Sequence, residues 1–472
     1  MRLILWFAVV LAVALSPRAG AQPLTDDPFA KAEAAIRAEM AKAGIPGAAV
    51  AVVVGDTVVW ARGFGVANAE TGAPVTPDTL FQIGSVTKSF TAAALLTAAS
   101  QGAIALDKPV ATYVSGLTPC VGAPTLTQLL SHTGGIIDEP DEFGPQGEEG
   151  LGAYQRTWTN EYCLLPPGRA FSYSNSGFSL AGLALQEVDK KPFADVMRAR
   201  VLAPLGMTRT TFRPMEAMTW PLAVGHRKAK EGKFEVVRPL ANDARLWPAG
   251  TLYSSANEMA RFVMALMNDG KVDGKQVLPA GVATKMRVEA ARIPTTGERY
   301  GQGLFLNTDG AGHGGTMTGY VAQYSVDPDN HVGVVVLTNG DNANPAPIAA
   351  AVRPAAIAIA GKREPVVVDG GGTSPVVDIG GTAPAASLSP ALAEGYVGRY
   401  SNPRRFSVEV TRSGTVLTLK RAGRDLTMDY VAPGRFMVAL PRGGTETIIF
   451  GLGPDGRADY LQMNVWALAR VP

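Results

Sequence analysis

The stretch 81-FQIGSVTKSFTAAALL-96 places a serine and a lysine three residues apart, Ser85 and Lys88, at the head of a predicted helix. Residues i and i+3 share one face of a helix, so the hydroxyl and the amine can meet. Burial and the positive potential of a helix N-terminus both disfavour an ammonium ion and shift Lys88 toward its neutral form. A neutral lysine can take the proton of Ser85, and backbone N–H groups at the helix start can stabilise an oxyanion. The pair therefore fits a nucleophile and its base, although an ordinary polar first turn has the same letters.

A second polar motif, Tyr173-Ser174-Asn175, lies in 167-PGRAFSYSNSGFSLAG-182. A phenol near a lysine can relay protons to a leaving group, and an amide side chain can hold a substrate carbonyl. The same triplet recurs as Tyr400-Ser401-Asn402 without a serine–lysine pair nearby in sequence, and there we predict a strand end. We assign no role to Ser174.

The third motif is His313-Gly314-Gly315 in 312-GHGGTMTGY-320, ahead of a predicted buried strand at Val332–Leu337. Two glycines after a histidine suit a strand edge that lets a substrate backbone approach closely. A histidine beside a tight turn is the alternative interpretation of this segment.

The three motifs follow one another in the order S-x-x-K, Y-S-N and H-G-G, with spacings of about 90 and 140 residues. This arrangement resembles the penicillin-recognising serine hydrolases, most closely their class C β-lactamase-like branch, in which the second motif is Y-x-N. That branch contains β-lactamases, D-alanyl-D-alanine carboxypeptidases, D-aminopeptidases and esterases. Other segments look like family segments in family order, within about residues 27–360: 102-GAIALDKPV-110, 126-LTQLLSHTGGI-136, 203-APLGMTRTTF-212, 249-AGTLYSSANEMARF-262 and 333-GVVVLTNG-340.

The resemblance implies a role for each motif residue. Ser85 would be the nucleophile and Lys88 its activating base, while Tyr173 would relay protons in acylation and deacylation. Asn175 would hold the substrate. The resemblance also covers the segment around His132, which we interpret as a structural residue.

On the third motif, His313 takes the place of the lysine in K-T-G, and Gly314, Gly315 and Thr316 complete the substrate-binding strand. The oxyanion hole would be the backbone N–H groups of Ser85 and Thr316. A lysine here is a permanent cation that attracts a substrate carboxylate, whereas histidine is mostly neutral above a pKa of about 6.5. Forms with H-x-G resemble the aminopeptidases, amidases and esterases of the family, so efficient β-lactam hydrolysis is not the leading expectation.

The fold class implied by the resemblance is an α/β (α+β) β-lactamase/transpeptidase-like fold, with an antiparallel sheet flanked by helices and a helical subdomain. Apolar periodicity supports it. It predicts strands at 48–54, 58–64 and 332–337, and helices at 28–43, 85–99, 178–188, 257–268 and 346–360, the last interrupted at Arg353-Pro354.

Composition divides the chain further. Residues 364–390 are rich in proline, glycine and serine and have no aromatic residue, which is typical of a linker. Short alternating runs separated by glycine turns follow, which predict a small antiparallel β domain. The predicted organisation is a signal peptide at 1–21, a serine hydrolase domain at 22–362, a linker at 363–390 and a C-terminal β domain at 391–472.

The N-terminus has the layout of a secretory signal. Arg2 precedes an apolar run from Leu3 to Leu15, and Ala19-Gly20-Ala21 is a small-residue cleavage site. The run is too short for a comfortable membrane span. We therefore predict cleavage after Ala21, no stable membrane span afterwards, and a periplasmic or secreted protein, with an uncleaved anchor as the alternative.

Composition also bears on partners and cofactors. The net charge of +2 without a long basic run gives no reason to expect a nucleic-acid partner. Four histidines without H-E-x-x-H or C-x-x-C motifs give none to expect a metal site. The segment 451–456 matches the dinucleotide pattern G-x-G-x-x-G, but it contains Pro454-Asp455 between two strands and is predicted to be a turn, so no cofactor is expected. Cys120 and Cys163 form a disulfide or remain two buried thiols.

The segment 137-IDEPDEFGPQGEEG-150 has six acidic residues and no basic one. If it overhangs the pocket, it favours a cationic substrate end such as a free peptide amine. We favour the other interpretation, a solvated loop.

The leading functional hypothesis is an exported serine hydrolase that cleaves small amides or esters, including short or D-residue peptides, without metal or cofactor. A β-lactamase or D-alanyl-D-alanine carboxypeptidase is the alternative enzyme. A catalytically silent peptidoglycan- or peptide-binding module is the alternative that is not an enzyme.

Overall fold

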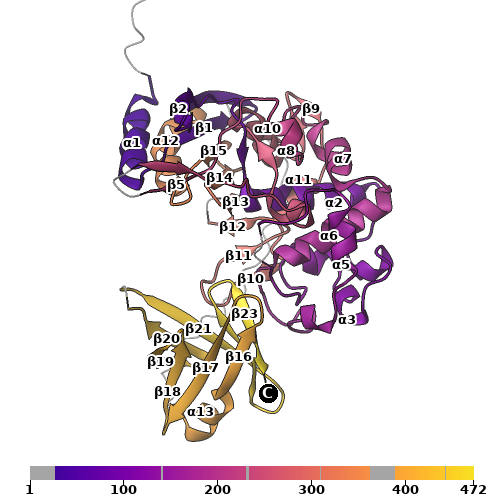
Figure 1. The fold of residues 1–472 in the computed structure, drawn as a ribbon, viewed down its shortest axis with the longest axis vertical. Coiled ribbons are helices and arrows are strands. Elements are labelled where there is room, and N and C mark those ends of the chain that lie inside the picture. Colours follow the sequence, from indigo (N-terminus) through magenta and orange to yellow (C-terminus); the bar gives the residue numbers. More distant parts are fainter. Residues whose placement is uncertain are drawn as a thin grey trace, which may run out of the picture.

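A computed structural model describes residues 27–139, 142–229, 233–308, 310–361, 388–441 and 443–471. Two units share these residues: a large domain (residues 27–361) and a barrel domain (residues 388–471), drawn below it in Figure 1. The predicted fold class and the small antiparallel β domain are confirmed. The predicted signal peptide, and the predicted linker except for its last three residues, lie outside the described residues. None of the described helices is long and apolar enough to cross a membrane.

An antiparallel sheet forms the centre of the large domain. Within the described residues it has nine strands in the order β10-β11-β12-β13-β14-β15-β1-β2-β3. The bounds are β1 Gly47–Val54, β2 Thr57–Asn68, β3 Ala73–Pro74, β10 Ala291–Arg292, β11 Arg299–Tyr300, β12 Phe305–Asn307, β13 Gly310–Met317, β14 Tyr320–Asp327 and β15 Val332–Thr338. The central strands β1 and β15 are buried along their whole length. Their unbroken apolar runs are explained by helices on both faces of the sheet.

The two faces of β1 belong to two different cores. Val50 and Val52 point toward α1 (Ala30–Ala43) and α12 (Pro345–Ala360). Ala49 and Ala51 point to the opposite face, which α10 (Ala256–Met267) and α2 (Thr87–Ser100) cover. This alternation follows from the two-residue period of a strand, and it places α2 between the sheet and the helical part of the domain.

The predicted interruption of the helix at 346–360 is wrong. The helix α12 runs without a break through Pro354. A proline inside a helix removes one backbone hydrogen bond and crowds the preceding turn. Here Ile348, Val352 and Ala356, spaced by four residues, are all fully buried against the sheet, and this packing outweighs the local cost.

The helical part of the large domain packs around α6 (Asn175–Asp189), on the side of α2 away from the sheet (Figure 1). Its other helices include α4 (Leu126–Leu130), α5 (Gly150–Gln155), α7 (Phe193–Met197) and α9 (Trp247–Gly250). The helix α6 begins three residues earlier than predicted because Ser174 caps it: Ser174 Oγ accepts a hydrogen bond from the Gly177 N–H at 2.9 Å.

The C-terminal strands close into a barrel in chain order, with β16 paired to β23. Helix α13 (Pro390–Tyr396) precedes them, and apolar side chains from all around the barrel fill its interior. The strands are β16 Gly398–Asn402, β17 Phe406–Ser413, β18 Val416–Arg421, β19 Arg424–Ala432, β20 Arg435–Ala439, β21 Thr445–Leu452, β22 Ala458–Met463 and β23 Trp466–Val471. The triplet at 400–402 ends β16, and the segment 451–456 includes the turn between β21 and β22, as predicted for both.

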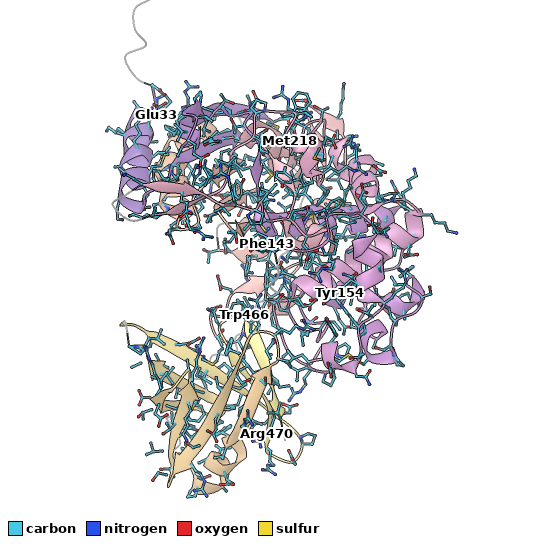
Figure 2. All side chains as sticks on the ribbon, in the orientation of Figure 1. Glu33, Phe143, Tyr154, Met218, Trp466 and Arg470 are labelled. Atoms are coloured by element: carbon cyan, nitrogen blue, oxygen red, sulfur yellow. A yellow bond between two sulfur atoms is a disulfide. The ribbon has the colours of Figure 1, made fainter. Side chains whose placement is uncertain are left out.

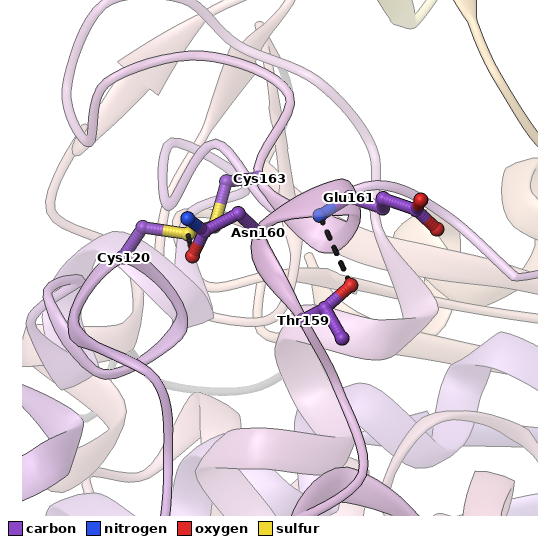
Figure 3. Close-up of a disulfide and its surroundings, with 5 residues drawn as sticks. All are labelled: Cys120, Thr159, Asn160, Glu161 and Cys163. Carbon is purple, nitrogen blue, oxygen red and sulfur yellow. Dashed lines mark hydrogen bonds between the residues drawn. A yellow bond between two sulfur atoms is a disulfide. The ribbon is translucent and has the colours of Figure 1, made fainter.

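Cys120 and Cys163 form a disulfide in the structure. Figure 3 shows the bond between Cys120, which lies in the short helix α3 (Pro119–Gly122), and Cys163, which directly follows the 3-10 turn Asn160–Tyr162. The bonded residues are 43 positions apart in sequence. The closed loop includes α4, His132 and the acidic segment. The disulfide therefore ties down a stretch of the large domain that has few regular elements of its own.

Replacing both cysteines by serine should lower the free energy of unfolding by roughly 2–4 kcal/mol, because the cross-link restricts the unfolded chain over a loop of this length. Urea unfolding of Cys120→Ser/Cys163→Ser and of the oxidised wild type measures the difference. Reduced wild type serves as the control and should unfold with the double variant. Coincident curves for oxidised wild type and the double variant would contradict the expectation.

Candidate active site

Ser85 lies where the sheet meets the helices. It belongs to the 3-10 turn Gly84–Val86 that directly precedes α2, rather than to the α-helix itself as predicted. Lys88 follows one turn later and is fully buried. Its Nζ lies 2.9 Å from Ser85 Oγ, so the structure brings together the two side chains of the first motif.

Lys88 Nζ has three oxygen partners. Asn175 Oδ1 lies at 2.6 Å and the carbonyl oxygen of Ala249 at 2.8 Å, in addition to the hydroxyl of Ser85. The amide and carbonyl oxygens only accept, so they bind both N–H groups of a neutral amine and leave its lone pair facing the hydroxyl. Burial lowers the pKa of Lys88 to about 7, with smaller opposing effects of Asp138, which raises it, and Arg405, which lowers it. At physiological pH a substantial share of Lys88 is thus a free base.

Tyr173 lies directly against this couple. Its ring centroid is 4.8 Å from Lys88 Nζ. Burial raises the pKa of Tyr173 well above its usual value, and a hydrogen bond with Ser85 opposes the rise. Tyr173 is therefore a neutral phenol that can give up a proton. The ring of His132 stacks on it at 4.1 Å, and Nδ1 of His132 accepts the Ser174 N–H, so His132 supports the phenol from behind.

Asn175 is the first residue of α6, which fixes its side chain beside Lys88. Asp138 Oδ1 accepts a hydrogen bond from the backbone N–H of Asn175 at 2.8 Å. A carboxylate at a helix N-terminus is favourable because the helix dipole is positive there. No described residue accepts a hydrogen bond from Asn175 Nδ2, so this donor remains available to a substrate carbonyl in the pocket that Asn175 lines.

Two glycines allow β13 to approach the nucleophile turn. A Cβ added to Gly315 would lie 2.0 Å from the carbonyl oxygen of Ile83 and 2.8 Å from Ser85 N. One added to Gly84 would lie 2.4 Å from Thr316 N, and the φ of +52° at Gly84 also favours glycine. The backbone nitrogens of Ser85 and Thr316 both lie at this contact, so the two segments that would supply a predicted oxyanion hole are adjacent.

His313 lies on β13 with its ring turned into the protein and only 4% exposed. Its Nδ1 donates to the carbonyl oxygen of Gly314, which leaves Nε2 to accept the Tyr300 hydroxyl at 3.1 Å. Burial, and then the nearby charge of Lys88, lower the pKa of His313 to about 3. The ring is therefore neutral, and this position lacks the cation that a lysine would supply. The centroid of the Tyr173 ring is 6.4 Å away.

A pocket of about 520 Å³ opens above these groups. The large domain and the barrel both line it. The contributions of the barrel are Arg405, Val465 and Trp466, and Figure 2 shows Trp466 at the end of the barrel that faces the large domain. The carbonyl oxygen of Val465 accepts the backbone N–H of Tyr173 at 2.8 Å, so the turn between β22 and β23 is bonded to the backbone that presents the phenol.

The preferred interpretation of the acidic segment as a solvated loop is wrong for Asp138, Glu139 and Glu142, whereas Glu149 is exposed as that interpretation expects. Asp138 is fully buried and pairs with Arg405, and Glu139 pairs with Arg404 at 2.6 Å. Glu142 lines the pocket and accepts hydrogen bonds from the backbone and hydroxyl of Thr318. Asp138 and Glu139 thus pair with arginines of the barrel, while Glu148 pairs with Arg213 of the large domain at 2.7 Å.

Sequence reasoning missed several residues of this site. Tyr300, Asp138, Arg405 and Trp466 belong to no motif, and each lies in a segment whose local pattern predicts only a strand, turn or loop. Asp138 and Arg405 are 267 residues apart. The one available signal was the run of six acids without a base, because so many uncompensated carboxylates require cations from elsewhere.

The fold and the serine–lysine centre together define a domain of the β-lactamase/transpeptidase-like class. The family model described as Beta-lactamase matches residues 32–359, more than half of the chain, and the chain belongs to this family. The resemblance drawn from the three motifs is thereby confirmed.

Individual relatives agree with this assignment. The chain is 29% identical over 320 residues to "Penicillin-binding protein 4" of Amycolatopsis lactamdurans, covering 63% of this chain and 81% of that protein. It is 26% identical over 336 residues to "Protein flp" of Staphylococcus aureus (strain COL), covering 67% of this chain but only 64% of that protein. The solved structure described as "Crystal structure of SurE" is similar with a TM-score of 0.74 at 27% identity, over 93% of this chain and 98% of that one.

The activity should follow the protonation of Lys88. The specificity constant kcat/KM for a p-nitrophenyl ester should show an acid limb with an apparent pKa near 7 and fall about tenfold per pH unit below it, because only the neutral amine accepts the Ser85 proton. His313 cannot produce this limb, since its pKa is lowered to about 3, and the pKa of His132 is lowered well below its usual value as well. An acid limb centred below pH 5 would contradict the assignment.

Gly315→Ala should reduce kcat/KM at least about 100-fold, because its methyl group would push β13 away from the nucleophile turn and open the oxyanion hole. It should also lower Tm. The matched control is Gly314→Ala, whose methyl group would meet nothing closer than the carbonyl oxygen of Ala322 at 3.9 Å and should leave Tm unchanged within measurement error. Equal losses of Tm in the two variants would contradict the tight contact at Gly315.

Proposed function

We propose that the chain is an exported serine hydrolase that cleaves small amides or esters through an acyl-enzyme on Ser85, with short or D-residue peptides as the leading substrate class. The observation that carries the proposal is the contact between Ser85 Oγ and a fully buried Lys88 whose pKa is lowered to about 7. A lysine whose pKa lies near 7 can both accept and donate a proton efficiently at neutral pH.

In acylation, Lys88 takes the proton of Ser85 as Oγ attacks the substrate carbonyl carbon. The carbonyl oxygen becomes an oxyanion between the N–H groups of Ser85 and Thr316. When the tetrahedral intermediate collapses, the bond to the leaving amine or alcohol breaks, and Tyr173 gives that group a proton. Tyr173 recovers a proton from the Lys88 ammonium, so both residues return to their starting states.

In deacylation, a water molecule attacks the Ser85 ester. Tyr173 accepts the proton of the water while it passes its own phenolic proton to neutral Lys88. The bond between the acyl carbon and Ser85 Oγ then breaks, and Oγ takes a proton from the Lys88 ammonium, so Ser85, Lys88 and Tyr173 return to their starting states. Asn175 Nδ2 holds the acyl carbonyl or amide of the substrate throughout. Every step uses groups that already lie within the site, without a metal or cofactor.

The charges around the pocket bear on the choice of substrate. His313 is neutral and buried, so the strand offers no lysine-like cation to a β-lactam or peptide carboxylate. Glu142 and Arg405, of opposite charge, both line the pocket. Since only one oxygen of Glu142 is bonded to a described residue, the other is available to a substrate amine. These features favour a substrate with a free amino terminus, or an uncharged amide or ester, over a β-lactam.

Export is part of the proposal. It rests on the predicted signal peptide with cleavage after Ala21 and on the Cys120–Cys163 disulfide, a bond that persists in oxidising compartments. The periplasm or the extracellular space would then be the place of action, and small molecules or peptides the partners.

A fluorophosphonate probe should label the purified mature protein on Ser85, and intact mass spectrometry would show one adduct. Ser85→Ala should lose the label and at least about 10⁴-fold in kcat on model esters. Unchanged ester turnover in Ser85→Ala, with Tm retained, would overturn the proposal.

A substrate panel separates the alternatives. It consists of p-nitrophenyl esters, D-alanine amides with a free or acetylated amine, D-alanyl-D-alanine peptides and nitrocefin. Nitrocefin or D-alanyl-D-alanine turnover comparable with ester turnover would establish the alternative enzyme. Binding of panel members without any turnover would establish the non-catalytic module.

A further inference from the structure

The barrel domain reaches the nucleophile through an unbroken series of polar contacts. Arg405, in the turn between β16 and β17, donates from Nη2 to Oδ2 of Asp138. Oδ1 of the same carboxylate accepts the backbone N–H of Asn175 at 2.8 Å. The side chain of Asn175 then accepts Lys88 Nζ at 2.6 Å, and Lys88 contacts Ser85 at 2.9 Å.

We propose that Arg405 of the barrel is a positioning residue for the Ser85–Lys88 couple, acting through Asp138 and Asn175. The inference rests on the proposed function, because it assigns Lys88 the part of the base. It goes beyond that function in making the C-terminal barrel a component of the catalytic apparatus of this chain.

Burial makes Asp138 depend on its partner. Its side chain is fully buried, while that of Arg405 is 22% exposed. A buried carboxylate without a cation is costly, and removing one partner of such a pair leaves the other charge uncompensated. Within the described residues, Arg405 is the cation that pairs with Asp138. The large domain therefore carries, where it meets the barrel, a buried negative charge that an arginine of the barrel neutralises.

The arginine itself is held in place. Its guanidinium lies over the ring of Trp466 at 5.0 Å. The adjacent residue Val465 binds the backbone of Tyr173, and the backbone N–H of Ala467 donates to Ser172 Oγ at 3.2 Å. One end of the barrel thus binds Ser172 and Tyr173 of the large domain. Of the residues at this end, Arg405 is the one whose contacts lead through Asp138 and Asn175 to Lys88.

The electrostatic consequence depends on every charged or titratable group that faces Lys88. Asp138 favours the ammonium form of Lys88 and Arg405 disfavours it. Tyr173 is a neutral phenol, and the pKa of His132 and of His313 is lowered, so both rings are neutral. Substitution of Asp138 should therefore lower the pKa of Lys88, and substitution of Arg405 should raise it.

The two single substitutions should move the acid limb of kcat/KM in opposite directions. Arg405→Met leaves Asp138 as an unpaired negative charge near Lys88 and should raise the apparent pKa by about one unit or more. At pH 7 kcat/KM should fall at least about fivefold, and most of it should return at pH 9. Asp138→Asn keeps an oxygen for the Asn175 N–H but leaves Arg405 unpaired, so the limb should move to lower pH.

The double variant Arg405→Met/Asp138→Asn should bring the limb back near its wild-type position, because both charges are gone. Arg405→Lys should restore part of the wild-type profile. The matched control is Arg404→Met: Arg404 is the neighbouring residue in the same turn and pairs with Glu139 of the same segment, but it lies outside the series of contacts to Lys88. The acid limb of kcat/KM of Arg404→Met should keep its wild-type position.

Full-length variants are compared by pH–rate profiles on a p-nitrophenyl ester, with Tm and fluorophosphonate labelling recorded in parallel. Opposite shifts for the two single variants, with Arg404→Met unshifted, support the role of Arg405. Equal losses at every pH, shifts in the same direction, or an Arg404→Met profile matching that of Arg405→Met would overturn it. Wild-type labelling on Ser85 tests the proposed function separately, so the two can fail independently.

Discussion

The site depends on the burial of one amine. None of the described carboxylates contacts Lys88 directly. Its pKa is lowered from 10.5 to about 7 chiefly by burial, which corresponds to a preference of about 5 kcal/mol for the neutral form relative to a solvated lysine. Its three oxygen partners come from three elements: the turn before α2, the start of α6, and α9. These elements must meet at one point to enclose the amine, so the packing of the helical subdomain against α2 also produces the lowered pKa that the proposed role of Lys88 as a base requires.

A second constraint is steric and concerns the backbone. An oxyanion hole built from N–H groups of two separate segments requires those segments to touch without side chains between them. Gly84 and Gly315 provide this contact, and at both positions an added Cβ would overlap backbone atoms, which cannot turn aside as a flexible side chain can. The order of the strands serves the same end, because β13 is held against the nucleophile turn by β14 and, through it, by the buried centre of the sheet.

The features that could be predicted from sequence are those with short-range signals. The S-x-x-K spacing places Ser85 beside Lys88, the apolar runs define β1 and β15, and the alternating segments indicate a β domain. Local rules misjudged the helix at Pro354, where burial against the sheet outweighs the loss of one hydrogen bond, and the first turn of α6, where Ser174 is the cap. The pairing of Asp138 with Arg405 had no local signal, because the sequence around a buried aspartate does not differ from the sequence around an exposed one.

The pairing of Asp138 with Arg405 gives both the acidic segment and the barrel an electrostatic role at the site. If Arg405 were replaced by an uncharged residue, Asp138 would be a buried carboxylate without its cation near Lys88, and its uncompensated charge would favour the ammonium form of Lys88. Apolar and charged contacts both hold the barrel there: Tyr460 and Ala467 pack in the core cluster of the large domain, Arg169 pairs with Asp459 at 2.8 Å, and Arg404 pairs with Glu139 at 2.6 Å. Charged pairs across an interface contribute more to orientation than to affinity. The barrel is oriented so that one arginine offsets one carboxylate, and in the proposed role the reactivity of Ser85 would depend on a residue more than 300 positions further along the chain.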